Sequence, residues 1–381
     1  MSRNGSPTVS NATNDVERVK PASRFDVGRL LIEGRAFMAL LVVIVVFSIL
    51  SKNYLTVNNM LTMSSHVAVY ALLAMGQLLV ILNGGIDLSV GSTLGLSGMV
   101  AGFLMQGVRL DAFGVVMYPA VWVVVIASCL VGALVGIING LLISRFKVAP
   151  FVATLGMLYV VRGFALLMTN GLTYNDLGGR SDLGNTGFDW LGFDRIATVP
   201  IGVLVMILVA VALSFLLSRT VFGRWLYASG GNERAAELSG VPVKRVKIWV
   251  YVASGVCSAI AGLILSSELT SASPTAGSSY ELTAIAAVVV GGAALTGGRG
   301  NIRGTLLGAF VIGFLSDGLV IIGVSAYWQT VFTGAVIVLA VLLNNIQYRG
   351  RRSRNQPGQQ PPASTTADQP TAEPASEPAG G

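Results

Sequence analysis

The sequence predicts an all-α, polytopic membrane protein with about ten transmembrane helices, some of them broken or re-entrant. Only 11% of its 381 residues are charged, whereas a soluble domain carries roughly 25%. Several separate apolar runs reach about 20 residues, the length that spans a bilayer. The 46 glycines fit the same class, because small residues let transmembrane helices approach closely.

The apolar runs mark ten expected spans, which follow one another along most of the chain. The runs at 67–82 and 282–296 are short, as expected beside broken helices, and the run at 116–143 is long enough to tilt or bend. In chain order, the expected spans are 36–51, 67–82, 88–106, 116–143, 150–169, 198–217, 248–267, 282–296, 304–324 and 328–346.

Polar segments flank the membrane domain, which we place at residues 31–347. Residues 1–30 form a polar N-terminal segment without the apolar region of a signal peptide. Residues 348–381 form a tail whose greater part is rich in Pro, Gln, Ser and Thr, and we expect this tail to be disordered.

The Lys and Arg residues indicate how the chain is oriented in the membrane. With a cytoplasmic N-terminus, twenty of them fall in cytoplasmic segments and four fall outside, namely Lys52, Arg109, Arg180 and Arg195. An odd number of spans would break this separation, so we expect both termini in the cytoplasm and the protein in the cytoplasmic membrane. The net charge of +7 therefore indicates membrane topology and not nucleic-acid binding.

A glycine-rich segment with one aspartate, residues 82–92, interrupts two apolar runs. A bend inside a membrane leaves backbone groups that lipid cannot satisfy, so it occurs only where protein or a water-filled cavity surrounds it. The segment therefore predicts an internal path for a solute. Asp87 either caps the helix that follows or fixes the broken segment beside that path. The residues expected at this part of the path are Gly84, Gly85, Asp87, Ser89 and Gly91.

Two charged residues lie inside apolar spans and are also expected at the path. Arg162 is roughly 18 Å along its helix at ~1.5 Å per residue, and Asp317 lies in the ninth span. A charge inside a membrane must face a partner or a cavity. Arg162 either extends toward the membrane surface or lines the path, and it could pair with Asp317.

Residues 230–242 predict a short helix with well-defined ends. Asn232 suits the N-cap, Glu233 complements the positive end of the helix dipole, and Gly240 suits the position after the last turn. A two-turn helix is marginal alone in water, so we expect it to dock on a cytoplasmic partner; an ordinary connection with a helical turn is the alternative. The expected docking residues are Asn232, Glu233, Arg234, Ala235, Glu237, Leu238 and Gly240.

Two series of glycines suggest an internal repeat. They are Gly132, Gly136 and Gly140 in the fourth span and Gly304, Gly308 and Gly313 in the ninth. Each series follows a glycine-rich break, an arrangement typical of transporters built from repeats, although glycine also simply packs membrane helices. The long polar segment at 170–197 is expected outside, either as a docking surface or as a passive connector.

Several classes of function lack their residues in this sequence. The two cysteines, Cys129 and Cys257, lie in separate apolar spans and the single histidine is His66, so neither a disulfide framework nor a His-based metal cluster is expected. No Gly-x-x-x-x-Gly-Lys-Ser/Thr sequence occurs, so any ATP hydrolysis needs a separate subunit. We expect a transport subunit with no cofactor and no catalytic residues.

Three segments, in order, resemble the ribose/xylose/galactose-type permeases, the monosaccharide branch of bacterial ABC importers. They are residues 83–91, 231–241 and 290–308, and the resemblance extends over about 36–347. It implies a subunit that forms a homodimer, or a heterodimer with a related permease, and binds ABC ATPase subunits in the cytoplasm. It also implies delivery of the sugar by an extracytoplasmic binding protein, and it identifies residues 231–241 with the segment that couples to the ATPase.

Other functions remain open at this stage. Within the same superfamily, the solute could be a branched-chain amino acid, a nucleoside or a signalling sugar. An ion-coupled secondary transporter is a less favoured alternative, because such proteins place charged residues at mid-membrane and only Arg162 and Asp317 clearly qualify. A channel or a receptor would need a filter motif or a soluble signalling domain, and we find neither in the sequence.

Overall fold

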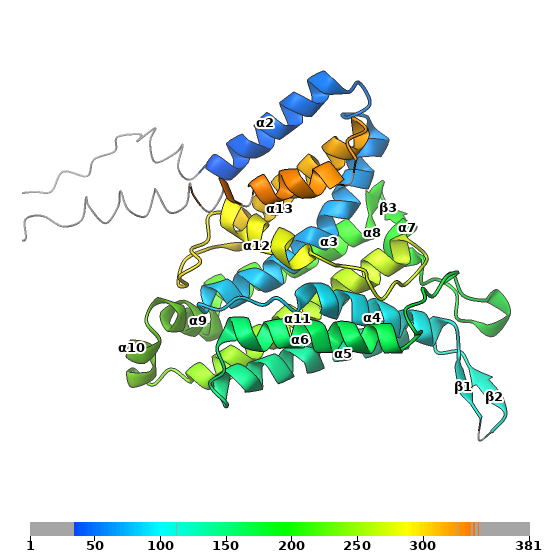
Figure 1. Cartoon of the computed structure of the whole chain (residues 1–381), viewed down its shortest axis with the longest axis horizontal. Coiled ribbons are helices and arrows are strands. Elements are labelled where there is room, and N and C mark those ends of the chain that lie inside the picture. Colours follow the sequence, from blue (N-terminus) through cyan, green and yellow to red (C-terminus); the bar gives the residue numbers. More distant parts are fainter. Residues whose placement is uncertain (1–33, 112, 326, 337, 340–341, 343–381) are drawn as a thin grey trace, which may run out of the picture.

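The computed structural model describes residues 34–111, 113–325, 327–336, 338–339 and 342, and helices form most of it (Figure 1). The expected N-terminal segment and C-terminal tail lie outside the described residues. The main helices are α2 (Arg35–Leu50), α3 (Val57–Leu82), α4 (Val90–Met105), α5 (Val121–Ser144), α6 (Pro150–Leu167), α8 (Ile201–Arg219), α11 (Val243–Glu268), α12 (Tyr280–Val290) and α13 (Ile302–Ile321).

These helices confirm the all-α membrane class. In the described part of the chain, six helices are long and apolar enough to cross a membrane, namely α3, α5, α6, α8, α11 and α13. Apolar helices of 10–17 residues occupy three further expected spans, at Ala36–Leu50, α4 and α12. Residues 327–336 are helical as well and overlap the tenth expected span.

Two of the expected spans differ from the observed helices. Helix α3 has 26 residues and begins at Val57, so the span expected at 67–82 is not short. Its first turns contain hydroxyl side chains that bond to helix carbonyls, as Ser64 does to Met60 O at 2.7 Å, and so the helix continues through a polar sequence. Helix α5 begins later than expected, because residues 115–117 form a strand.

The centre of the bundle is the contact of α11 with α5 and α3 (Figure 1). Helix α5 approaches α11 through its glycines, because a side chain at Gly132 or Gly136 would overlap the backbone of Gly255 or Tyr251. Gly140 faces Ile248 in the same way. Close backbone contact of this kind is how membrane helices pack where no hydrophobic driving force acts between them.

The second glycine series makes a similar contact between α13 and α12. A side chain at Gly304 or Gly308 would overlap the backbone of Gly291 or Ala287. Both series therefore have a packing role, and the internal repeat stays a prediction. The outward faces of α5, α6 and α8 carry exposed large apolar side chains such as Leu130, Phe164 and Leu208.

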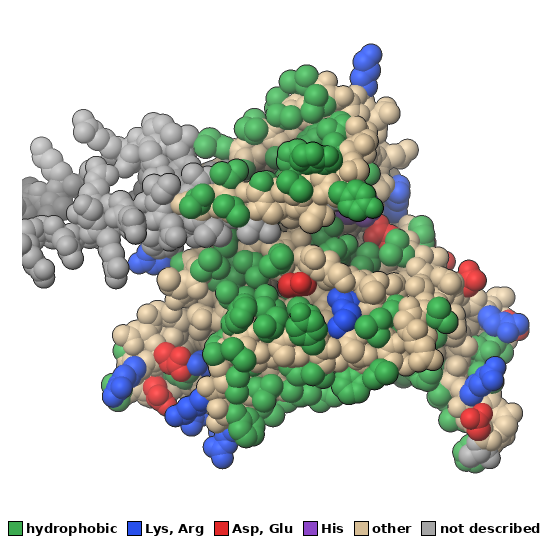
Figure 2. Space-filling model, viewed as in Figure 1, with side chains coloured by type: hydrophobic (Ala, Val, Ile, Leu, Met, Phe, Trp, Pro, Cys, Tyr) green, Lys and Arg blue, Asp and Glu red, His purple; other side chains and the backbone are tan. Residues whose placement is uncertain are grey.

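The two ends of the bundle differ in structure. Helices α9 (Val221–Gly231) and α10 (Glu233–Leu238) form one end. The hairpin of β1 (Val108–Leu110) with β2 (Val115–Met117) lies at the other, as do the 3-10 helix η1 (Ser181–Leu183), helix α7 (Trp190–Phe193) and the short pair β3 (Arg195–Ile196) with β4 (Val199–Pro200) (Figure 1). Figure 2 shows charged side chains gathered at these two ends and hydrophobic side chains over much of the surface between them.

Candidate functional site

The interruption after α3 folds back into the protein. Gly84, at φ +80°, turns the chain at the end of α3, and the following segment runs back beside that helix. With its amide group oriented to match the groups around it, the Gln77 side chain donates to Asp87 O at 3.0 Å and accepts from Asp87 N at 3.2 Å. Thr154 of α6 donates to Ile86 O at 3.0 Å. Protein side chains thus satisfy the exposed backbone groups of a membrane break, as the sequence requires.

Asp87 is the centre of a buried polar network and is only 2% exposed. Its Oδ1 accepts from Ser89 N at 2.9 Å and from Ser89 Oγ at 2.6 Å. Its Oδ2 accepts from Ser254 Oγ on α11 at 3.1 Å, and Asn139 of α5 donates to Ser89 Oγ at 2.8 Å. The carboxylate therefore fixes the broken segment to α11, Ser89 links the same segment to α5, and the carboxylate points into the protein.

Arg162 holds a second irregular segment, which enters the bundle from the opposite end. Its Nη1 donates to Pro274 O at 2.6 Å and to Ala276 O at 2.7 Å. Both carbonyls belong to the connection between α11 and α12. The guanidinium thus turns inward to the protein and satisfies a non-helical backbone at membrane depth.

The two irregular segments meet at the first turns of α4. A side chain at Gly91 would overlap Gly277 O and lie against the carboxylate of Glu281, in the first turn of α12. A side chain at Gly95, one turn further, would lie 2.9 Å from both Ala276 O and the Arg162 guanidinium. Two partly exposed charges of opposite sign therefore lie over neighbouring glycines. The sequence prediction missed Glu281, which directly precedes the span expected at 282–296.

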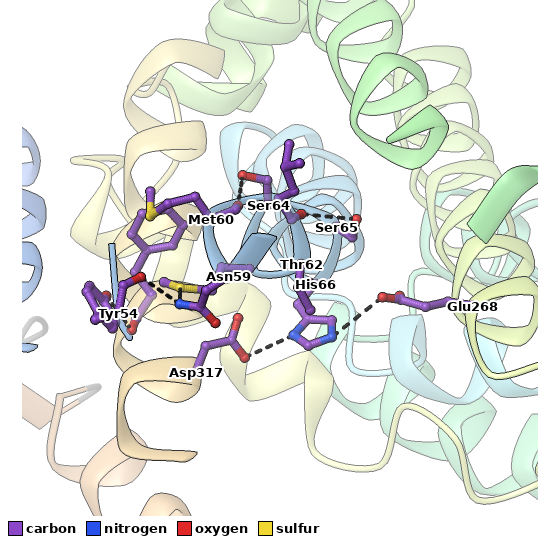
Figure 3. Close-up of polar contacts among 12 residues, drawn as sticks. Tyr54, Asn59, Met60, Thr62, Ser64, Ser65, His66, Glu268 and Asp317 are labelled. Atoms are coloured by element: carbon purple, nitrogen blue, oxygen red, sulfur yellow. Dashed lines mark hydrogen bonds and ion pairs between the residues drawn. The ribbon is translucent and has the colours of Figure 1, made fainter. Parts of the chain in front are cut away.

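Asp317 does not pair with Arg162, contrary to the pairing considered from the sequence. Its Oδ1 lies 3.0 Å from Nδ1 of His66, and Nε2 of the same imidazole lies 3.5 Å from Glu268 Oε1 (Figure 3). The sequence did not indicate this cluster, because His66 lies just before the span expected at 67–82 and Glu268 just after the one at 248–267. Only the packing of three helices brings these side chains together.

Helix α10 has the ends that the sequence predicts. The Asn232 side chain accepts from Ala235 N at 3.0 Å, which is the N-cap bond, and Gly240 has a φ of +83° just after the last turn. Glu233 pairs with Lys247 of α11 at 2.7 Å. All seven expected docking residues are exposed, and Leu238 is 82% exposed.

Helix α9 connects α10 directly to the start of the break after α3 and to the glycine-rich loop before α13. Gly298 N donates to Leu82 O at 2.9 Å, and a side chain at Gly230 would overlap that same carbonyl. The Asn83 side chain donates to Ser229 Oγ at 2.9 Å. The end of α3, the glycine-rich loop before α13 and the end of α9 therefore meet at one point, one residue away from the N-cap of α10.

Comparison with known proteins gives the family. A family model described as "Branched-chain amino acid transport system / permease component" matches residues 59–341. The ribose import permease protein RbsC of Escherichia coli K12 is 43% identical over 316 residues, which cover 83% of this chain and 94% of that protein. The Bacillus subtilis ribose import permease is 46% identical over 309 residues, covering 81% and 91% of the two chains.

A relative named for a different sugar also matches. The D-allose transport system permease protein AlsC of Escherichia coli K12 is 36% identical over 313 residues, which cover 81% of this chain and 90% of that protein. No solved structure matches the chain. The family model matches most of the chain, and relatives exceed 40% identity. The chain therefore belongs to the family that this model describes, the binding-protein-dependent ABC transport permeases that include the branched-chain amino acid permease component.

Proposed function

We propose that this chain is the membrane permease subunit of an ATP-driven importer for a monosaccharide of the ribose type. The observation that carries the proposal is its similarity, at 43% and 46% identity, to ribose import permeases of two distant bacteria over more than nine-tenths of their length. The allose permease is less similar, at 36%. Ribose is therefore the first solute to test.

In this proposal, α10 is the element that couples the permease to an ABC ATPase. It is capped and exposed, and its Leu238 offers an apolar side chain to a partner groove. Its movement would pass through the contact of Gly230, Leu82 and Gly298 to the break after α3 and to the glycine-rich loop before α13. ATP binding and hydrolysis on the separate subunit would thereby change the accessibility of the path.

We place the solute path along the partly exposed side chains of Arg162 and Glu281, which pack closely over Gly95 and Gly91. These two charges act on each other electrostatically, yet among the described residues they form no direct ion pair. A sugar hydroxyl can donate to the carboxylate and accept from the guanidinium, whereas a single ion would be repelled by one of the two. The pair therefore suits a solute without net charge, such as a polyol.

A second copy of the chain, or a related permease, would complete this path. Partly exposed charges at membrane depth are costly against lipid, so this surface needs a protein partner, while the apolar outer faces of α5, α6 and α8 contact lipid. The Lys and Arg distribution supports a cytoplasmic location for α10. The β1–β2 hairpin and residues 170–197 then face outward, where an extracytoplasmic sugar-binding protein would dock.

The test is uptake of radiolabelled ribose by proteoliposomes that contain the permease with its ATPase and its binding protein. We expect uptake only with ATP inside, and competition by ribose above allose and leucine. Uptake driven by a proton gradient without ATP would instead establish an ion-coupled transporter. ATP-dependent uptake of leucine but not ribose would keep the class and overturn the solute.

A further inference from the structure

His66, the single histidine of the chain, lies between two carboxylates that belong to two other helices (Figure 3). Asp317 is on α13 and Glu268 is the last residue of α11, at 3.0 and 3.5 Å from the two ring nitrogens. The imidazole is 43% exposed, and the two carboxylates are only 17% and 15% exposed. Neither the proposed path nor the coupling helix uses this cluster.

The groups around the cluster do not balance the negative charges of its two carboxylates. Tyr70, one turn along α3, packs on Tyr280 of α12 with ring centroids 5.0 Å apart. Tyr54, whose hydroxyl donates to Phe314 O at 3.1 Å, lies near Asp317. Tyrosines are neutral at physiological pH, and no Lys or Arg of the described residues forms an ion pair with Glu268 or Asp317. The imidazole is therefore the cation available to both carboxylates.

The geometry fits the protonated form of His66. Each ring nitrogen faces a carboxylate oxygen, and ionised carboxylates only accept hydrogen bonds. A neutral imidazole has one N–H and would turn its other nitrogen lone pair toward an acceptor. The imidazolium has two N–H donors and can serve both. When the proton leaves, the two partly buried carboxylates lose the positive charge that lies between them, and they repel each other.

We propose that His66, Glu268 and Asp317 form a proton-operated clasp that holds α3, α11 and α13 together at the end of the bundle opposite α10. Histidine is the side chain whose ordinary titration lies within the physiological pH range. With the imidazole protonated, the clasp is closed. As pH rises through its titration, the proton passes to water, the carboxylates repel each other, and the end of α13 separates from α11.

The test measures the distance between α13 and α11 by electron paramagnetic resonance on the full chain in nanodiscs. Spin labels at Val320→Cys and Leu269→Cys use exposed positions beside the two carboxylates, in a background with Cys129→Ala and Cys257→Ala. We expect a short distance at about pH 5.5 and a shift to longer distances at about pH 8, on either side of the ordinary titration of imidazole.

Two substitutions at the same position give matched controls. His66→Gln cannot become charged, so the long distance is expected at both pH values. His66→Lys stays charged at both, so the short distance is expected throughout. Because the chain has one histidine, nuclear magnetic resonance of the wild-type protein labelled with ¹⁵N-histidine reports the protonation of the His66 imidazole directly. An imidazole that titrates without any change in distance, or that is neutral at both pH values, would overturn the proposal.

Discussion

At the scale of single residues, the buried carboxylate of Asp87 carries the most contacts of the candidate site. It accepts from Ser89 and Ser254, and it anchors a non-helical segment to α11 and to the N-cap residue of α4. A buried polar group that loses its partner costs about 1–3 kcal/mol. The effect of a substitution at Asp87 therefore comes through stability of the broken segment, before any effect on the solute.

We expect Asp87→Ala to lower both the thermal stability of the purified permease and its uptake, because Ser89 and Ser254 lose their acceptor. Asp87→Asn should lose less, since hydroxyls can rotate to donate to its amide oxygen. Thermal unfolding monitored by size-exclusion chromatography, with uptake in parallel, measures both. Wild-type stability in Asp87→Ala would show that the network does not stabilise the interruption.

For Arg162, geometry counts as well as charge. Its Nη1 serves two carbonyls at once, which a lysine ammonium on a flexible stem does less well. We expect Arg162→Lys to lose part of the uptake and Arg162→Gln to lose most of it, with ATPase association unchanged in both. Glu281→Gln should reduce the affinity for sugar with little loss of stability. Full uptake by Arg162→Gln would remove this residue from the path.

The site shows what sequence can and cannot predict about residues. The helix caps of α10 and the break at 83–89 follow from local chemistry, so they could be predicted. The partners of Arg162 and Asp317 depend on which helices pack together, and the sequence carries no local signal for that. Glu281 and His66 each lie at the edge of an apolar run, where a hydropathy pattern cannot separate a buried polar group from the start of a loop.

At the scale of elements, α5 and α11 are held by close backbone contact along a row of glycines. Because Gly136 faces the backbone of Tyr251 and Val252, a larger side chain must force the two helices apart. The hydropathy pattern predicted both helices but not which face of α5 meets α11. That information lies in the spacing of the glycines, for which the sequence allowed two interpretations, helix packing and an internal repeat.

We expect Gly136→Leu to prevent a stable bundle, because overlap with backbone cannot be relieved by a rotamer change. Gly156→Ala on α6 is the matched control, since nothing lies within 4 Å of a Cβ there. Alanine is better in a helix than glycine by about 1 kcal/mol, so this variant should be at least as stable as wild type. Equal yields of monodisperse protein for both variants would contradict the packing argument.

One exposed apolar residue at each end of the bundle gives a second pair of variants for comparison. Leu238 on α10 is 82% exposed and Phe113, beside the β1–β2 hairpin, is 79% exposed. We expect Leu238→Asp to abolish co-purification of the ATPase and Phe113→Asp to leave it intact. Neither change removes a buried contact, so both variants should insert normally. An ATPase that still binds Leu238→Asp, even weakened twofold, would move the coupling site away from the tip of α10.

At the scale of the whole molecule, hydropathy predicted the class and the order of the spans because lipid exposure imposes length and polarity on each helix. It failed at the start of α3, where polar residues are accommodated inside the helix. The irregular segments are the parts that hydropathy describes least, and they converge from both ends on α4. The proposed solute site therefore lies in the parts of the chain that hydropathy describes least.

The meeting of Gly230, Leu82 and Gly298 has a mechanical consequence. At this point three stretches of chain touch backbone to backbone, with no flexible side chains between them. A joint made of side chains yields under load, since rotamers can change, whereas peptide planes in direct contact transmit displacement with little loss. In the proposed function, the stroke of the partner subunit would thus reach the membrane interior through a stiff linkage, and the stiffness depends on the absence of side chains at Gly230 and Gly298.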